Sequence, residues 1–376
     1  MANGGAGLDL APSVARPRRN RARMCHPHCV VASLSNDEVD ALKRTLAGLL
    51  SLALLGGVAL AAPSAPVGIA IPGGHAGLDL DDIAFVPALD RIVVPAGQTG
   101  RLLLIDPANL ATSEIGGVTA AAAGGSMPPD AATTSVSYGD GYLFASNHAP
   151  TQVVVIDAHG GKVVDRTALA SGPDYVRFLA AGNEVWVTEP HAKQIQVFRF
   201  STQPTPALTA VATIAVPGGP ESLVFDPARH RAYANLWRGE TVAIDTRSHA
   251  LVAHWQNGCT GSRGLALDEA HAHLFVGCSE GKVVALDVAH GGRQVASAAA
   301  GEGIDIISYS PALHRLYVPA GKSANLTVFD VTATGKLAPL GNWPAAAHSH
   351  CVADDDHGTA FVCDPRAGKV LVYRTH

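Results

Sequence analysis

The stretch PALDRIVVPAG at residues 87–97 returns as PALHRLYVPAG at residues 311–321. Eight of the eleven positions are identical although 224 residues separate the copies, which marks an internal repeat. Fainter copies begin at Phe225 (FDPARHRAYANL) and at Leu267 (LDEAHAHLFVGC). Each copy joins two short apolar runs by a polar turn, and a third run such as GRLLLID or GKVVALD follows. The pattern predicts strand, turn, strand, loop, strand in every repeat.

Seven such units cover most of the chain, with boundaries near residues 77–117, 132–170, 171–216, 218–257, 258–300, 301–344 and 345–376. Units of roughly 40–45 residues with four strands each are typical of β-propellers. The last unit is short and lacks an outer strand, and the isolated strand expected within residues 66–75 can supply it. We therefore expect an all-β chain: one seven-bladed β-propeller over residues 62–376, its ring closed by an N-terminal strand.

The N-terminal part of the chain has the pattern of a targeting segment. Lys43 and Arg44 precede the apolar run 46–61, which ends in the small-x-small pattern Ala-Leu-Ala. We expect residues 39–61 to be a signal peptide and residues 1–38 to be a non-native or disordered extension. The motif CHPHC at 25–29 offers metal-ligating side chains, but five residues alone do not build a metal cage. The sequence thus predicts a periplasmic or secreted protein.

Charge narrows the range of partners. Removing residues 1–61 takes away 7 of the 27 Lys and Arg residues and 4 of the 32 Asp and Glu residues, which leaves 20 basic and 28 acidic residues. A net charge of −8 disfavours nucleic acid and anionic membranes as partners. We expect no stable membrane insertion once the signal peptide is cleaved.

Four cysteines lie in the predicted propeller, and an even number in an exported chain suggests disulfides. Cys351 and Cys363 flank one hairpin, and Cys259 and Cys278 lie at one end of another unit. We predict the pairs 259–278 and 351–363. The alternative is a copper or zinc site built from His348, His350, Cys351 and Cys363. Neighbouring strand residues point to opposite faces, which disfavours His350 and Cys351 as ligands of one ion.

The runs GRLLLID, TVAID and GKVVALD and the RLYVPAG-type second strand resemble the YVTN-repeat (YncE-like) seven-bladed β-propellers. This resemblance implies an exported bacterial protein. The wider superfamily includes lactonase-type propellers, cytochrome d1-type domains and quinoprotein amine-dehydrogenase heavy chains. The sequence contains no CxxCH motif, so covalent haem is not expected.

One column of residues stands out when the units are aligned on their second strands, because it begins each innermost strand. Its members are Asp81, Thr133 or Thr134, Asp174, Glu221, Arg263, Asp305, and Ser349 or His350. Innermost strands line the central channel of a propeller, so these side chains should converge at one mouth, with Asp82 and Arg177 nearby. Neighbouring carboxylates repel, and a bound cation offsets that repulsion. A divalent metal such as Ca²⁺ would have as ligands Asp81, Asp174, Glu221 and Asp305. The competing interpretation is structural, with Arg177 and Arg263 balancing the acids.

Loops between the second and third strands open on the same rim. They add His148, Glu189, His191 and Trp237 as candidates to face a ligand. The leading hypothesis is an exported binding or scaffold propeller that holds a small molecule or a periplasmic protein at this acidic mouth. The second is a metal-dependent lactonase or esterase in which His350 or His148 moves protons. A third, resting on the superfamily alone, is an accessory of a periplasmic quinoprotein system.

Overall fold

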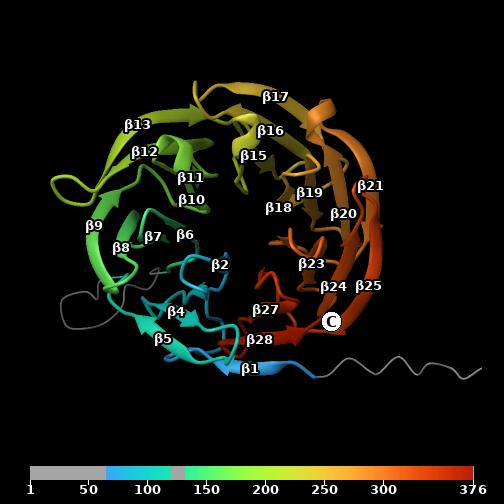
Figure 1. The fold of residues 1–376 in the computed structure, drawn as a ribbon, viewed down its shortest axis with the longest axis horizontal. Coiled ribbons are helices and arrows are strands. Elements are labelled where there is room, and N and C mark those ends of the chain that lie inside the picture. Colours follow the sequence, from blue (N-terminus) through green and yellow to red (C-terminus); the bar gives the residue numbers. More distant parts are fainter. Residues whose placement is uncertain (1–64, 120–131, 376) are drawn as a thin grey trace, which may run out of the picture. The chain divides into compact units, whose positions relative to one another are not determined.

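The computed structural model describes residues 65–119 and 132–375, and within them it contains seven four-stranded antiparallel sheets arranged as blades around a ring (Figure 1). The predicted seven-bladed β-propeller is confirmed. The expectations for the signal peptide, for residues 1–38 and for the CHPHC motif concern residues outside these ranges. In the described part of the chain, no helix combines the length and apolar character of a membrane span.

The first four blades contain these strands. Blade 1 has β2 (Ala84–Val86), β3 (Arg91–Pro95), β4 (Leu102–Ile105) and β5 (Thr112–Ile115). Blade 2 has β6 (Val136–Gly139), β7 (Tyr142–Asn147), β8 (Gln152–Asp157) and β9 (Lys162–Ala168). Blade 3 has β10 (Val176–Leu179), β11 (Glu184–Glu189), β12 (Gln194–Ser201) and β13 (Ala207–Ala215). Blade 4 has β14 (Val224–Asp226), β15 (Arg231–Leu236), β16 (Glu240–Asp245) and β17 (Leu251–Gln256).

The remaining blades follow the same order. Blade 5 has β18 (Ser262–Asp268), β19 (His273–Cys278), β20 (Lys282–Asp287) and β21 (Arg293–Ala299). Blade 6 has β22 (Ser308–Ser310), β23 (Arg315–Ala320), β24 (Asn325–Val331) and β25 (Leu337–Pro344). Blade 7 has β26 (Val352–Asp354), β27 (Thr359–Asp364), β28 (Lys369–Arg374) and β1 (Val67–Ala70). Short 3-10 turns are η1 (Ala180–Gly182), η2 (Pro227–Arg229) and η3 (Val288–His290).

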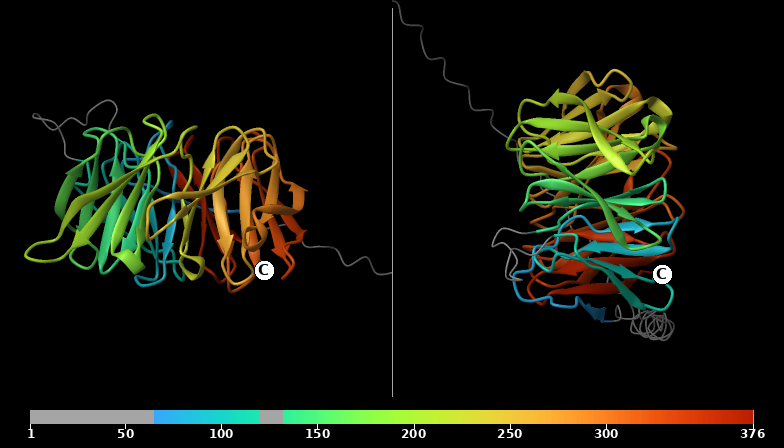
Figure 2. Two further views of the ribbon diagram at one scale, coloured as in Figure 1. Left: turned by 90° about the horizontal axis from the view of Figure 1, so that it is seen from above. Right: turned by 90° about the vertical axis from the view of Figure 1, so that its left-hand side faces the viewer.

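Burial explains the composition of the strands. Middle strands such as β19 (HLFVGC) are buried at every position, because both faces pack against neighbouring blades. Outer strands such as β9 alternate between exposed and half-buried residues. Figure 2 shows the ring from two further sides, with the blades packed one beside the next. Between the blades lie apolar clusters, including one of Phe144, Phe198 and Phe200 and one of Phe275, Leu316 and Phe329.

The ring closes as predicted from residues 66–75. Strand β1 pairs antiparallel with β28, from Val67 opposite Val372 to Ala70 opposite Lys369. The last blade is therefore built from both ends of the described chain, and β28 has a partner on each side. Pairing of this kind covers an edge that would otherwise be open to other strands.

Both predicted disulfides are present, Cys259–Cys278 and Cys351–Cys363. Each links residues near one end of a single blade, and each pair lies at least partly within strands. The bond in blade 7 occupies the sulfur atoms of Cys351 and Cys363, which the alternative copper or zinc site would have required as thiolates. Disulfides are typical of exported proteins.

Candidate functional site

Backbone hydrogen bonds fix which residues are equivalent around the channel. In the innermost layer, Gly264 N donates to Asp305 O (2.8 Å), Ile306 N donates to His350 O (2.9 Å) and Asp82 N donates to Thr134 O (2.8 Å). In each bond, the donor is the residue that directly follows a member of the predicted column, and the acceptor is the column member of the next blade. The column therefore continues through Thr134 rather than Thr133 and through His350 rather than Ser349. We call the opening where the innermost strands begin the acidic mouth, and the opening where they end the far mouth.

The acidic mouth brings the predicted carboxylates together. Ligand atoms of Asp81, Asp305 and His350 all lie within 4.8 Å of one another. Burial raises the pKa of Asp81 well above its usual range, and the neighbouring charges of Asp305 and Glu221 raise it further. Burial raises the pKa of Asp174 in the same way, and the charges of Asp81 and Glu221 add to this effect. Charges on other blades thus oppose the ionisation of both Asp81 and Asp174.

Arginines compensate only part of this charge. Arg263 forms an ion pair with Glu221, and Arg177 Nη2 lies 3.0 Å from Asp82 Oδ1. Burial nevertheless outweighs Arg263 and raises the pKa of Glu221 to about 7. Three further carboxylates receive no side-chain hydrogen bond or ion pair from any residue that the structure describes; they are Asp81, Asp174 and Asp305.

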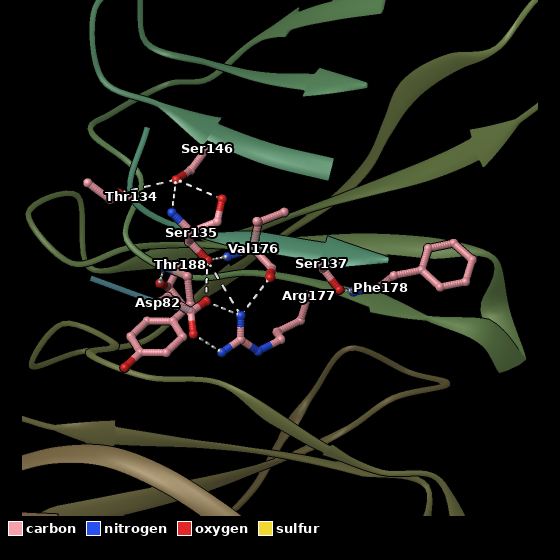
Figure 3. A network of polar contacts seen from close by, with 10 residues as sticks. Asp82, Thr134, Ser135, Ser137, Ser146, Val176, Arg177, Phe178 and Thr188 are labelled. Carbon is pink, nitrogen blue, oxygen red and sulfur yellow. Dashed lines mark hydrogen bonds and ion pairs between the residues drawn. The ribbon is translucent and has the colours of Figure 1, made fainter. Parts of the chain in front are cut away.

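Asp82 directly follows the column residue Asp81 in the chain. It belongs to a buried network of hydrogen bonds across three blades (Figure 3). Ser135 Oγ donates to Asp82 and accepts from Val176 N at 3.0 Å. Arg177 binds Asp82 with both terminal nitrogens and donates to Val176 O at 2.9 Å. The guanidinium also lies 4.8 Å from the centre of the Tyr175 ring, within the range of a cation–π contact. Sequence reasoning placed Asp82 and Arg177 near the mouth, and the structure shows them bound to each other.

Tyr175 also lies near the acids of the acidic mouth, although the sequence pattern did not predict it as a site residue. Its side chain is buried, and the charges of Asp81, Asp82, Asp174 and Asp305 raise the pKa of its hydroxyl further after burial has raised it. The one signal in the sequence is its position directly after Asp174 in the acid column.

His350 is held in a defined orientation. Its Nδ1 lies 2.6 Å from the carbonyl oxygen of His348, and a carbonyl can only accept, so Nδ1 carries the proton. In the neutral ring, Nε2 therefore keeps its lone pair for a proton or a metal ion. Asp305 and His350 also line a cavity of about 560 Å³, together with Asp79, Lys322 and Arg366.

The predicted rim residues lie in different surroundings. His148 is half-buried, its Nε2 is 3.0 Å from Thr134 Oγ1, and burial lowers its pKa, so it contacts the column through Thr134. Glu189 is fully buried, accepts from Gln194 Nε2 at 2.6 Å, and has a pKa raised by burial. His191 and Trp237 are exposed and pack edge-to-face at 6.1 Å. Of these residues, only His148 is tied to a member of the column.

Comparison with known proteins supports the fold of this chain but does not indicate its function. No protein-family model and no curated protein matches the chain. Among solved structures, it is similar to a chain in the crystal structure of the mitotic checkpoint complex, with 12% identity and a TM-score of 0.66 over 84% of this chain and 92% of that one. It is also similar to the β-propeller domain of Cps50 (Swd1) from Myceliophteria thermophila, with 11% identity and a TM-score of 0.65 over 84% of this chain and 100% of that one. The chain is thus a seven-bladed β-propeller.

Proposed function

We propose that the protein is an exported binding propeller of the YVTN-repeat type, whose acidic mouth holds a positively charged small ligand or a positively charged group of a periplasmic protein partner. The observation that carries this proposal is the gathering of Asp81, Asp174 and Asp305, none of which forms an ion pair with a described residue. A cation bound there would favour their ionised forms and offset their repulsion. The two disulfides support an oxidising compartment.

A protein partner is supported by the kind of fold. The neighbour described as part of the mitotic checkpoint complex is a component of a protein assembly. Propellers present their loops at two mouths of one rigid ring, and loops on a rigid scaffold are where binding residues concentrate. For this chain, the charge of the acidic mouth would select a basic segment of such a partner.

The double variant Asp81→Asn, Asp305→Asn should bind cations at least about 10-fold more weakly than the unmodified protein, because it removes two of the three carboxylates that have no ion-pair partner. Isothermal titration calorimetry with Ca²⁺, Zn²⁺ and 1,4-diaminobutane, each alone, measures this. Asp140→Asn is the matched control, since Asp140 is an exposed residue of the β6–β7 turn with the same charge. If none of the three cations binds the unmodified protein, or if the double variant binds them equally well, the acidic site is refuted.

A metal-dependent lactonase or esterase is the second candidate, favoured by the approach of Asp81, Asp305 and His350 within 4.8 Å. Two carboxylates and one imidazole suit a divalent ion such as zinc, which would polarise the carbonyl of an ester when bound. We expect His350→Gln to lower both Zn²⁺ affinity and hydrolysis of δ-valerolactone by the Zn²⁺-treated protein. If Zn²⁺ binds but the lactone is hydrolysed no faster than in buffer, the hydrolase hypothesis is rejected and the binding propeller remains.

A further inference from the structure

The channel contains a second cavity, lined by Asp82, Arg177 and residues of the innermost strands. Its volume is about 440 Å³, within the range of small-molecule sites. It extends from Asp82 and Arg177 along the innermost strands β2, β6, β22 and β26 to residues at their ends, such as Pro87 and Pro311. None of the column carboxylates lines it. The far mouth therefore leads to a site distinct from the one proposed above.

The wall of this cavity combines apolar and aromatic side chains with a nearly equal share of polar surface. Phe85, Tyr138 and Tyr309 contribute rings, and branched side chains such as Ile306 and Ile307 also line the cavity. Surfaces of this kind bind the apolar body of a ligand. Aromatic faces also attract positive charge.

One carboxylate in the wall lacks a cationic partner. Asp354 is 6% exposed, and its two oxygens accept one hydrogen bond each, from Ser308 Oγ (2.7 Å) and from Asp356 N (3.1 Å). A carboxylate has about four lone-pair sites, so acceptor capacity remains. Burial raises the pKa of Asp354 to about 6, which leaves it mostly ionised at pH 7.5. No Lys or Arg forms an ion pair with it among the residues that the structure describes.

The other charges in the wall do not reverse its sign. Among the residues that the structure describes, Arg177 is the one Lys or Arg that lines the cavity, and Asp82 already pairs with it. Asp356 adds a second acid, whose Oδ1 accepts from Ser310 Oγ and from Ala312 N. An anionic ligand would meet two acids and an arginine that is already neutralised. A cation would meet a desolvated carboxylate in a cavity that aromatic rings also line.

We propose that the far-mouth cavity binds a primary ammonium group carried on an apolar or aromatic body. The ammonium group donates to Asp354, and the body packs against Phe85, Tyr138 and Tyr309. This site is independent of the ligand at the acidic mouth, so either one can exist without the other.

Calorimetry at pH 7.5 with three probes of nearly equal shape tests the charge preference. The probes are 2-phenylethylamine, the neutral 2-phenylethanol and the anionic 3-phenylpropanoate. We expect saturable one-to-one binding of the amine, at least about 10-fold tighter than either analogue, since a hydrogen bond between charged groups is stronger than a neutral one. The proposal is overturned if the alcohol or the acid binds as tightly as the amine, or if the amine does not bind at millimolar concentration.

Two variants locate the binding. Asp354→Asn keeps the shape of the side chain and should weaken amine binding about 10-fold or more. Leu265→Phe adds bulk at the cavity wall, leaves every acid in place, and should weaken all binding there even if Asp354→Asn fails to fold. Asp140→Asn serves as the charge-matched control. If folded Leu265→Phe and folded Asp354→Asn bind the amine like the unmodified protein, the far-mouth site is refuted, whatever the outcome of the metal and diamine titrations at the acidic mouth.

Discussion

Asp81→Asn is expected to make the propeller more stable at pH 7.5, by about 2 kcal/mol in the free energy of unfolding. At that pH the acids of the acidic mouth have two options in the unmodified protein. Either several neighbouring carboxylates ionise and repel one another, or some stay protonated at a pH that favours loss of the proton, and both options cost free energy of folding. Burial and the charges of Asp305 and Glu221 both act against the ionised form of Asp81. An asparagine of the same shape removes one charge from this group. For a domain of more than 250 residues, the gain corresponds to roughly 5 °C in Tm.

The same reasoning gives a direction with pH. The folded-state pKa of Glu221 is raised from 4.5 to about 7, so between these values the folded chain holds more protons than the unfolded chain. Stability then falls as pH rises through this window, because the slope follows the protons bound in the unfolded state minus those bound in the folded state. Asp81 and Asp174 contribute with the same sign.

Thermal melts at intervals from pH 4.5 to pH 8 measure this dependence. We expect the unmodified protein to lose stability across the window and Asp81→Asn to lose less. Asp140→Asn should follow the unmodified protein, because Asp140 is exposed in a turn. A destabilised Asp81→Asn, or an identical pH slope in the two proteins, would show that the ring carboxylates do not repel in the folded state. Combined with weaker cation binding, a stabilised variant would identify the mouth as a site kept for binding at the expense of stability.

Repetition made the architecture predictable. PALDRIVVPAG and PALHRLYVPAG fall on the β2–β3 and β22–β23 hairpins of blades 1 and 6. The missing outer strand of the last unit indicated β1, and the two disulfides each link residues of one blade. These features depend on local patterns and short separations. The acid column was visible for a related reason, since residues equivalent in a repeat lie equivalently around a ring.

Side-chain partners across blades could not be predicted in this way. Arg177 pairs with Asp82 although 95 residues separate them, and no local pattern selects that partner over Asp81 or Asp174. The choice of His350 over Ser349 depends on one backbone hydrogen bond, which Ile306 of the preceding blade donates. The far-mouth cavity likewise depends on how innermost strands of several blades leave space between side chains, which the sequence does not encode locally.

Removing β1 is expected to have the largest effect on the fold. Val67–Ala70 supply the outer strand of blade 7, and Ile69 packs on an apolar cluster that extends through several blades. Loss of these backbone hydrogen bonds and of the Ile69 contact should lower the free energy of unfolding by about 4 kcal/mol. The edge of β28, KVLVYR, would be left unpaired and would recruit strands from other chains.

A chain that begins at residue 71 should therefore melt well below a chain that begins at residue 65, and it should form oligomers in light scattering after size-exclusion chromatography. The two chains differ by six residues, so the longer one is a close control. Adding a peptide of residues 66–73, PVGIAIPG, should restore the size and the melting temperature of the longer chain, whereas a scrambled peptide should not. Rescue in trans would separate strand pairing from any general effect of truncation, because the peptide replaces hydrogen bonds without restoring the covalent chain. If the shorter chain keeps the size and the melting temperature of the longer chain, blade 7 is stable with three strands. Pairing of β1 with β28 would then contribute no measurable stability.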